Sequence, residues 1–406
     1  MRLFATFFML CTLNAQEDSL VQGMSTSELA KIRPAVEEMI GAEKLVGGSV
    51  LVMRHGEIVY HEQFGHRDRE KKLPMEKDTL FRIYSMTKGL TSAAALMLCE
   101  EGKMTLDDPI GLHLPSLKSQ SVLLSETEKE AALRNTTVRD LLRHTSGYGN
   151  SWGGPLGKIY RENGVSNRGA PLAQMIESVA PLPLLYQPGE RWVYGLSSDV
   201  LAAVIASAAQ QPFEKVLQDK LLIPLGMTDT FFQVPAEKAH RLAVQYRKRK
   251  EKLTIADSAE NSSYLKDPVF KGGGSGLVST TTDYAIFLQM IANGGVLNEI
   301  RYLREDTVEL MRTNQLPRSI ECISFGENDQ RHGTGFGLGF SVKYREDDRW
   351  DPHAALGEYG WGGAASTHYW ISPKDHLIVV TMEQTMPYNW NLEHGLKPLI
   401  YSAIKK

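Results

Sequence analysis

Two strand–turn–strand patterns lie near opposite ends of this 406-residue chain. The stretch "GGSVLVMRHGEIVYHEQFG" contains two β-rich runs around His55-Gly56, a pair of residues typical of a tight hairpin turn. The stretch "ASTHYWISPKDHLIVVTMEQ" repeats the pattern, with a turn at Pro373, Lys374 and Asp375. Because a short turn joins antiparallel strands, both patterns predict an antiparallel sheet.

The residues between these hairpins have helical character. Apolar residues recur at helical spacing, and Gly or Pro closes each run. The runs are "KGLTSAAALMLCEEG", "VRDLLRHTSG", "SDVLAAVIASAAQQPFEKVLQDKLLIPLG" and "TTTDYAIFLQMIANGG". Before the first hairpin, "STSELAKIRPAVEEMIG" predicts one more helix, from a capping box of Ser25 and Glu28 to Gly41.

If the two strand-rich ends pair, they form one sheet. We therefore expect an α/β (α+β) fold, in which an antiparallel sheet is flanked by helices and a mostly helical subdomain is inserted. A single domain would span residues 24–406, with strand-rich parts at about 45–80 and 330–403 and helices at about 81–300. The cleft between sheet and subdomain is the default ligand site.

The overall charge argues against polyanionic partners. The chain has 45 Lys and Arg residues against 48 Asp and Glu residues, for a formal net charge of −3. Such a balance gives no general attraction for phosphate backbones or anionic lipid. We expect no nucleic acid partner, and the sequence sets no oligomeric state.

The N-terminal stretch resembles a secretory signal. "MRLFATFFMLCTLNAQED" has one Arg, an apolar run from Leu3 to Leu13 and a small residue, Ala15, before polar residues. We expect residues 1–15 to be cleaved near Ala15 and the protein to be exported to the periplasm or secreted. A lipoprotein signal with Cys11 as acceptor is the weaker alternative, because bulky residues precede that cysteine. No apolar run is long enough for a stable membrane span.

Two cysteines remain after such cleavage, Cys99 and Cys322. Two residues so far apart in sequence do not make a disulfide framework, and whether they pair stays open. Cys99 lies in an apolar helical run, which favours a buried thiol.

A serine and a lysine lie one helical turn apart in "FRIYSMTKGL". A serine hydroxyl needs a nearby base before it becomes a useful nucleophile, and Lys88 is in position to serve Ser85. Lys88 can accept a proton only as a neutral amine, which burial and a neighbouring helix N-terminus both favour. The small apolar run "AAALM" behind Ser85 is typical of a buried central helix.

With these features the chain resembles the serine β-lactamase and penicillin-binding protein superfamily, whose members carry a Ser-x-x-Lys motif. It is most similar to the class C β-lactamase-like family VIII carboxylesterases. The resemblance covers about residues 47–385 and includes "TVRDLLRHTSGYG", "YQPGERWVYGLSSDVL", "IPLGMTDTFF" and "GGGSGLVSTTTDY".

The resemblance implies a catalytic role for Tyr194, just before a helix that we expect Ser197 or Ser198 to cap. Its phenol would pass a proton between Ser85 and the leaving group. The third position of the family's Tyr-x-Asn motif is Leu196 here, so an amide that helps to hold β-lactam side chains is missing.

The family's Lys-Thr-Gly motif is also missing, and "WGGAASTHYW" stands at the matching strand. Trp361 would offer a flat apolar wall with one N–H donor in place of a cation, which favours neutral esters over anions. Gly362 and Gly363 would let a substrate approach the strand backbone. By resemblance, the backbone N–H groups of Ser85 and Ala364 form the oxyanion hole.

Two other candidates carry less weight. "HEQFGH" has its second histidine one position too late for the zinc-protease motif and reads as a strand, so we expect no metal there and no cofactor. His144 in "RHTSGYG" suggests a Ser-His-Asp triad, but in the family this stretch is a structural turn.

The combined prediction is a serine hydrolase that cleaves small carboxylic esters, or transfers their acyl groups, through an acyl-enzyme on Ser85. One alternative is a β-lactamase or D-alanyl peptidase acting on β-lactam or cell-wall peptide. The other is a scaffold that keeps the fold without the chemistry. The acyl length and the natural acceptor stay open.

Overall fold

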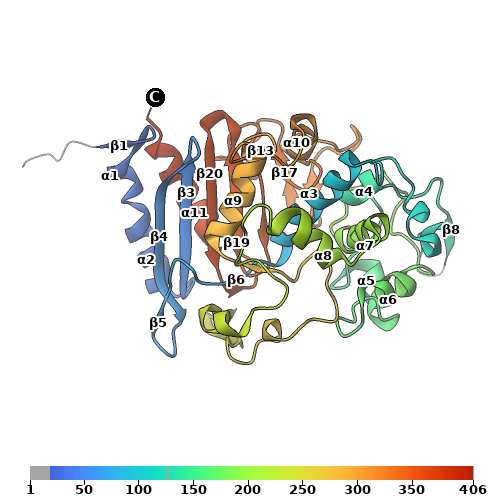
Figure 1. Ribbon diagram of the computed structural model, residues 1–406, viewed down its shortest axis with the longest axis horizontal. Helices are drawn as coiled ribbons and strands as arrows, with labels where there is room; N and C mark the ends of the chain where they lie inside the picture. The colour runs from blue at the N-terminus through green and yellow to red at the C-terminus, as the bar shows by residue number, and fades with distance from the viewer. Residues whose placement is uncertain (1–18, 126–127, 406) are drawn as a thin grey trace, which may run out of the picture.

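One eight-stranded antiparallel sheet joins the two ends of the chain (Figure 1). The computed structural model describes residues 19–125 and 128–405. The strands follow in the order β16 (Thr334–Phe336), β17 (Ser341–Lys343), β18 (Tyr359–Gly363), β19 (Thr367–Ser372), β20 (Leu377–Glu383), β3 (Gly47–Arg54), β4 (Glu57–Asp68) and β5 (Leu73–Pro74). The pairing of β20 with β3, from Leu377 opposite Arg54 to Glu383 opposite Gly48, closes the sheet. This confirms the predicted antiparallel sheet with flanking helices.

Both predicted hairpins are confirmed. His55 and Gly56 adopt φ of 51° and 84° between β3 and β4, as a two-residue turn with two left-handed positions requires. A short 3₁₀ turn at Pro373–Asp375 links β19 to β20.

The predicted N-terminal helix is two helices, α1 (Thr26–Leu29) and α2 (Ile32–Gly41). Pro34 has no N–H to donate to the carbonyl of Ala30, and its ring clashes with that carbonyl in a continuous helix. Ser25 caps α1 by accepting the N–H of Glu28, as predicted, whereas the Glu28 carboxylate pairs with Lys31.

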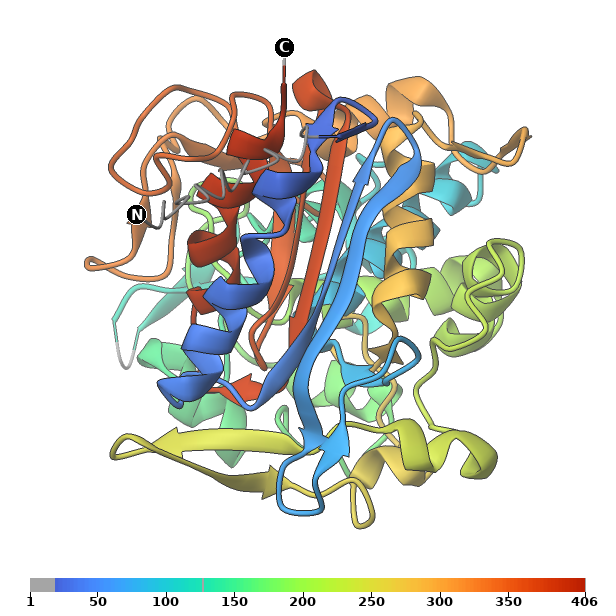
Figure 2. The same ribbon diagram turned by 90° about the vertical axis from the view of Figure 1, so that its left-hand side faces the viewer.

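Helices cover both faces of the sheet. Figure 2 shows α1 and α2 beside α11 (Asn391–Ala403) over one face, where Trp370 and Val379 of the sheet pack against Ile32, Val36 and Leu396. The opposite face carries α9 (Thr281–Ala292) and the central helix α3 (Thr87–Glu100) (Figure 1). Every residue of α3 from Thr87 to Leu98 is buried, so the predicted central helix is confirmed.

The helical part of the chain extends beyond α3. Its helices are α4 (Val138–Leu142), α5 (Gly154–Glu162), α6 (Leu172–Val179), α7 (Ser197–Ala209), α8 (Phe213–Leu217) and α10 (Glu305–Arg312). Short strand pairs complete the fold: β1 (Leu20–Val21) with β2 (Met24–Ser25), β6 (Phe81–Arg82) with β11 (Val278–Ser279), β7 (Ser121–Leu123) with β8 (Lys129–Ala131), β12 (Val296–Leu297) with β13 (Ile300–Arg301), β14 (Ile323–Ser324) with β15 (Gln330–Arg331), and β9 (Gln245–Arg249) between β10 (Lys252–Asp257) and β21 (Thr385–Met386).

Three sequence expectations concern other parts of the chain. The proposed signal at residues 1–15 lies outside the described residues. Within the described residues, no helix has both the length and the apolar character needed to cross a bilayer. Cys99 and Cys322 are both free thiols, and Cys99 is half-buried rather than fully buried, with burial raising its pKa to about 12.

A buried ion cluster ties α11 to the sheet. The Lys397 ammonium lies 2.6 Å from Asp351 Oδ2, 2.8 Å from Glu358 Oε1 and 3.1 Å from Glu393 Oε1. Burial alone would lower the pKa of Lys397, but these carboxylates hold it well above its ordinary value. The cluster thus links α11, which carries Lys397 and Glu393, to Glu358 just before β18 and to Asp351 in the preceding loop.

Removing this ammonium should destabilise the fold. We expect Lys397→Met to lower the free energy of unfolding by about 3–5 kcal/mol, because it leaves buried carboxylates without their counter-charge. Lys374→Met, at an exposed turn, should change it by less than about 0.5 kcal/mol. Urea unfolding followed by circular dichroism measures both, and equal stabilities of the two variants would contradict this account.

Candidate active site

Ser85 lies in a 3₁₀ turn, Tyr84–Met86, between strand β6 and helix α3. The preceding residue, Tyr84, has a φ of 41°, a conformation that costs a non-glycine residue energy and that surrounding contacts must maintain. The Tyr84 hydroxyl donates to Gln245 Oε1 at 2.5 Å, and β6 pairs with β11 on the other side. These contacts hold Ser85 at the start of α3, as the sequence predicted.

Lys88, in the first turn of α3, points at Ser85. Its Nζ lies 3.2 Å from Ser85 Oγ and donates to the carbonyl oxygen of Gly274 at 2.7 Å. The Gly274 N–H in turn donates to the Asp199 carboxylate of α7 at 2.8 Å. Lys88 is 6% exposed, so its amine is withdrawn from bulk water and held by a fixed backbone acceptor.

Tyr194 completes the group from the opposite side of the cleft. Its Oη lies 2.7 Å from Ser85 Oγ, and its ring covers the Lys88 amine with 4.7 Å between Nζ and the ring centroid. The Trp361 indole N–H donates to the same Tyr194 oxygen at 3.4 Å. The structure therefore brings Ser85, Lys88 and Tyr194 together, although they come from two distant parts of the chain.

The segment after Tyr194 differs from the expectation in its helix cap. Helix α7 begins at Ser197, so Leu196 occupies the N-cap position and neither Ser197 nor Ser198 caps it. The Ser197 hydroxyl instead bonds the Ser146 hydroxyl at 2.8 Å, which satisfies it inside the core. The Leu196 side chain is buried in the main core, so this residue supplies no polar group in place of the missing amide.

The glycines after Trp361 line the cavity, as a role in substrate approach requires, and they also have a structural role. A Cβ at Gly363 would lie 2.3 Å from the carbonyl oxygen of Ile83, and one at Gly362 would lie 2.6 Å from the Tyr388 hydroxyl. These glycines make room for the protein's own chain, which lets the end of β18 approach the turn that carries Ser85. Ala364 follows directly and lines the same cavity as Ser85.

His144 is a packing residue behind Tyr194. It is buried, and its ring centroid lies 5.1 Å from that of Tyr194. Burial and the neighbouring Lys88 charge lower the pKa of His144 to about 3, so its ring is neutral at physiological pH. Its Nδ1 has no hydrogen-bond partner among the described residues, so it lacks the orienting carboxylate that a triad histidine requires.

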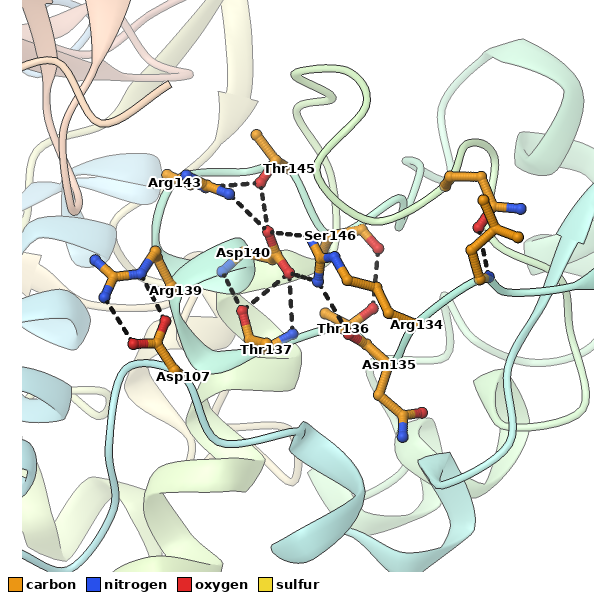
Figure 3. A network of polar contacts seen from close by, with 12 residues as sticks. Asp107, Arg134, Asn135, Thr136, Thr137, Arg139, Asp140, Arg143, Thr145 and Ser146 are labelled. Carbon is orange, nitrogen blue, oxygen red and sulfur yellow. Dashed lines mark hydrogen bonds and ion pairs between the residues drawn. The ribbon is translucent and has the colours of Figure 1, made fainter. Parts of the chain in front are cut away.

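A buried carboxylate organises the segment that supports His144 (Figure 3). Asp140 accepts hydrogen bonds from Arg134 at 2.5 Å, Arg143 at 3.1 Å, and the hydroxyls of Thr137 and Thr145 at 2.9 Å each. Burial acts to raise the pKa of Asp140, but the hydrogen bond and charge of Arg134 hold it below its ordinary value.

This network reaches Tyr194 through the backbone. The carbonyl of Thr145 accepts the N–H of Gly189 at 2.7 Å, and the carbonyl of His144 accepts the N–H of Val193 at 2.8 Å. The Asp140 side chain therefore positions the turn at His144 and Thr145, and the backbone of this turn binds the segment that carries Tyr194.

The three residues open into a cavity of about 520 Å³. Its walls include Trp361, Phe325 and the exposed Trp152, together with the buried guanidinium of Arg331. Sequence analysis missed Phe325, Trp152 and Arg331, because they come from loops and the short strand β15 and belong to no recognisable motif.

The nearest approach to a metal-ligand set in the described part of the chain is Asp351, Glu393 and His394. The Lys397 ammonium already contacts both of these carboxylates, so it supplies the positive charge there. The "HEQFGH" segment lies in strand β4, as expected.

An antiparallel sheet with a Ser-x-x-Lys helix on one face and a tyrosine across the cleft defines the β-lactamase-like class of folds. The Beta-lactamase family model matches residues 32–396, and the chain belongs to this family. The resemblance noted from the motifs is thereby confirmed.

Relatives cover nearly the whole chain. Protein Rv1367c of Mycobacterium tuberculosis is 34% identical over 368 residues, which are 87% of this chain and 89% of that protein. Esterase EstB of Burkholderia gladioli is 29% identical over 386 residues, 89% of this chain and 91% of that protein. The solved structure of EstCE1, described as a hydrolase with promiscuous acyltransferase activity, has a TM-score of 0.80 at 25% identity and covers 92% of this chain and 99% of its own. The fold is that of a serine hydrolase family with esterase and acyltransferase neighbours.

The Asp140 network yields a pH-dependent prediction. Because the pKa of Asp140 is lower when folded than its ordinary 3.8, its contribution to stability is present above that pH and lost in acid. We expect Asp140→Asn to cost about 2–4 kcal/mol of unfolding free energy at pH 7 and progressively less as the pH falls below about 4.

Asp107→Asn is the matched control, because Asp107 pairs with Arg139 in the same region but is exposed. It should cost less than about 1 kcal/mol at any pH. Guanidinium unfolding at a series of pH values measures these differences, and a constant Asp140→Asn effect from pH 7 to pH 3 would contradict the role given to its charge.

Proposed function

We propose that this protein is a serine hydrolase of the carboxylesterase type, which cleaves small carboxylic esters through an acyl-enzyme on Ser85. One observation carries the proposal: Ser85 Oγ lies within hydrogen-bonding distance of both Lys88 Nζ and Tyr194 Oη at the base of a cavity. A nucleophile with two proton-transfer groups in contact is what covalent acyl transfer requires. Relatives that include an esterase and a hydrolase with acyltransferase activity support it.

The first half-reaction forms a bond from Ser85 Oγ to the ester carbonyl carbon. The serine proton passes to Lys88, directly or through Tyr194, as the oxyanion develops. The N–H groups of Ser85 and Ala364 would hold that oxyanion. When the carbon–oxygen bond to the alcohol breaks, Tyr194 gives the departing oxygen a proton and recovers one from Lys88.

The second half-reaction releases the acyl group. Water, or an alcohol, attacks the acyl carbon and loses its proton to the same Lys88 and Tyr194 pair, and Ser85 Oγ departs with a proton. Water as acceptor gives hydrolysis, and an alcohol gives transesterification. The protein's own groups supply every proton transfer in this scheme.

The β-lactamase or D-alanyl peptidase alternative has less support. By the resemblance, Leu196 stands in place of the family's motif asparagine and Trp361 in place of its motif lysine, and both side chains are buried. Both changes remove groups that would bind a β-lactam, and a weak activity on cephalosporins is the most that we propose.

The proposal is tested with a panel of 4-nitrophenyl esters and a chromogenic cephalosporin. We expect ester turnover by the wild type and a loss of at least about a thousandfold in Ser85→Ala, since the nucleophile is removed. Tyr194→Phe should lose about 10²- to 10⁴-fold. Ser116→Ala, at an exposed turn remote from the cavity, should match the wild type.

Intact-mass analysis after ester exposure locates the acyl group. An acyl adduct on the Ser85 peptide is the expected result, and an adduct elsewhere would reassign the nucleophile. Turnover of the cephalosporin alone would favour the lactamase alternative, and neither turnover nor adduct would favour a scaffold.

A further inference from the structure

Arg331 is a buried cation in the wall of the catalytic cavity. It ends strand β15 and is 7% exposed. Four aromatic rings surround its guanidinium, with distances from Cζ to the ring centroids of 4.3 Å (Phe325), 4.8 Å (Trp350), 4.9 Å (Trp390) and 5.8 Å (Trp361). Aromatic faces attract a cation but accept no strong hydrogen bond, so they hold the guanidinium without satisfying its N–H groups.

The hydrogen-bonding capacity of Arg331 is unused. Its Nε is buried and has no hydrogen-bond partner within residues 19–125 and 128–405. Its two terminal nitrogens also make no hydrogen bond to these residues, but they are not buried and remain accessible from the cavity. Nε forms an ion pair with Asp329 Oδ1 at 3.5 Å, which is too poorly aligned to be a hydrogen bond although both atoms are buried. A buried charged group normally has its donors paired, so this one calls for an acceptor from outside the chain.

The other basic side chains in the described cavity wall are already engaged or exposed. Lys88 donates to Gly274, Lys397 lies among three carboxylates, and Lys343 donates to the carbonyls of Asp347 and Asp351. Arg168 forms a similar long ion pair, 3.6 Å from the Asp199 carboxylate, but its side chain is half exposed, so water can satisfy its donors. Arg331 is thus the buried cation whose donors remain open in the described cavity wall.

Trp361 connects Arg331 to the reacting group. The same indole that faces the guanidinium donates its N–H to Tyr194 Oη at 3.4 Å. The Trp361 indole therefore separates a group bound by Arg331 from the carbonyl that Ser85 attacks.

We propose that Arg331 binds a carboxylate of the substrate, so that the preferred esters carry a carboxylate several atoms from the scissile carbonyl. This inference rests on the proposed esterase function and names its substrate class. A planar guanidinium matches a carboxylate with two parallel N–H···O bonds. This proposal differs from the neutral esters expected from Trp361, because the Arg331 guanidinium lies 5.8 Å from the centroid of that indole.

The test compares matched esters that differ in charge. On the acyl side, mono-4-nitrophenyl adipate is paired with its neutral carbamoyl analogue, 4-nitrophenyl 5-carbamoylpentanoate. On the alcohol side, 4-acetoxyphenylacetate is paired with 4-acetoxyphenylacetamide. For at least one pair, Arg331→Met should lower kcat/KM of the charged ester by tenfold or more beyond its effect on the neutral one.

Two further variants separate charge from geometry. Arg331→Lys should recover part of the preference for the charged ester, because it keeps the cation without the planar fork. Arg168→Met removes another cation from the cavity wall and should change the charged-to-neutral ratio less than threefold. A ratio unchanged in Arg331→Met for both pairs overturns the proposal, provided that the variant still turns over the neutral esters.

Binding to Ser85→Ala keeps this inference separate from the catalytic one. If the wild type hydrolyses no ester, the proposed function fails, but calorimetry with hexanoate and hexanamide still tests Arg331. We expect Arg331→Met in that background to weaken hexanoate at least tenfold and to leave hexanamide nearly unchanged. Hexanoate binding that does not depend on Arg331, or no hexanoate binding at all, would overturn the carboxylate site.

Discussion

The contact of the buried Lys88 amine with Ser85 Oγ is the interaction on which the rest of the site depends. An amine at this depth needs acceptors, and the carbonyl of Gly274 supplies one at 2.7 Å. That requirement fixes the position of Gly274, whose N–H donates to the Asp199 carboxylate of α7. Lys88 thereby connects the central helix α3 to the loop before α9, and Gly274 of that loop connects in turn to helix α7.

The sheet explains why the site forms at this place. Strand β18 ends beside the turn of Ser85 because Gly363 leaves no side chain between it and Ile83. Trp361 of the same strand then reaches the Tyr194 hydroxyl, and the Asp140 network sets the turn that supports Tyr194. Ser85 and Lys88 thus share one segment of the chain, and Tyr194 comes from a second segment that the Asp140 network supports.

Local patterns predicted what depends on local chemistry. The two hairpins, the buried helix after Ser85 and the spacing of Ser85 and Lys88 follow from turn residues and helical periodicity, and the structure has them all. The break between α1 and α2 could also have been predicted from Pro34, because proline has no N–H to bond the carbonyl four residues earlier. The environment of Arg331 could not be predicted, because the four aromatic rings around it are brought together only by folding.

The claim that Lys88 activates Ser85 is tested most directly by the second-order rate at which a small uncharged fluorophosphonate labels Ser85. This reaction needs the nucleophile and its base but no particular ester. The account predicts labelling at least about a hundredfold slower in Lys88→Met than in the wild type at pH 7.5, with unfolding curves that show both proteins folded. Equal labelling rates would show that Ser85 reacts without its amine, and would contradict the account.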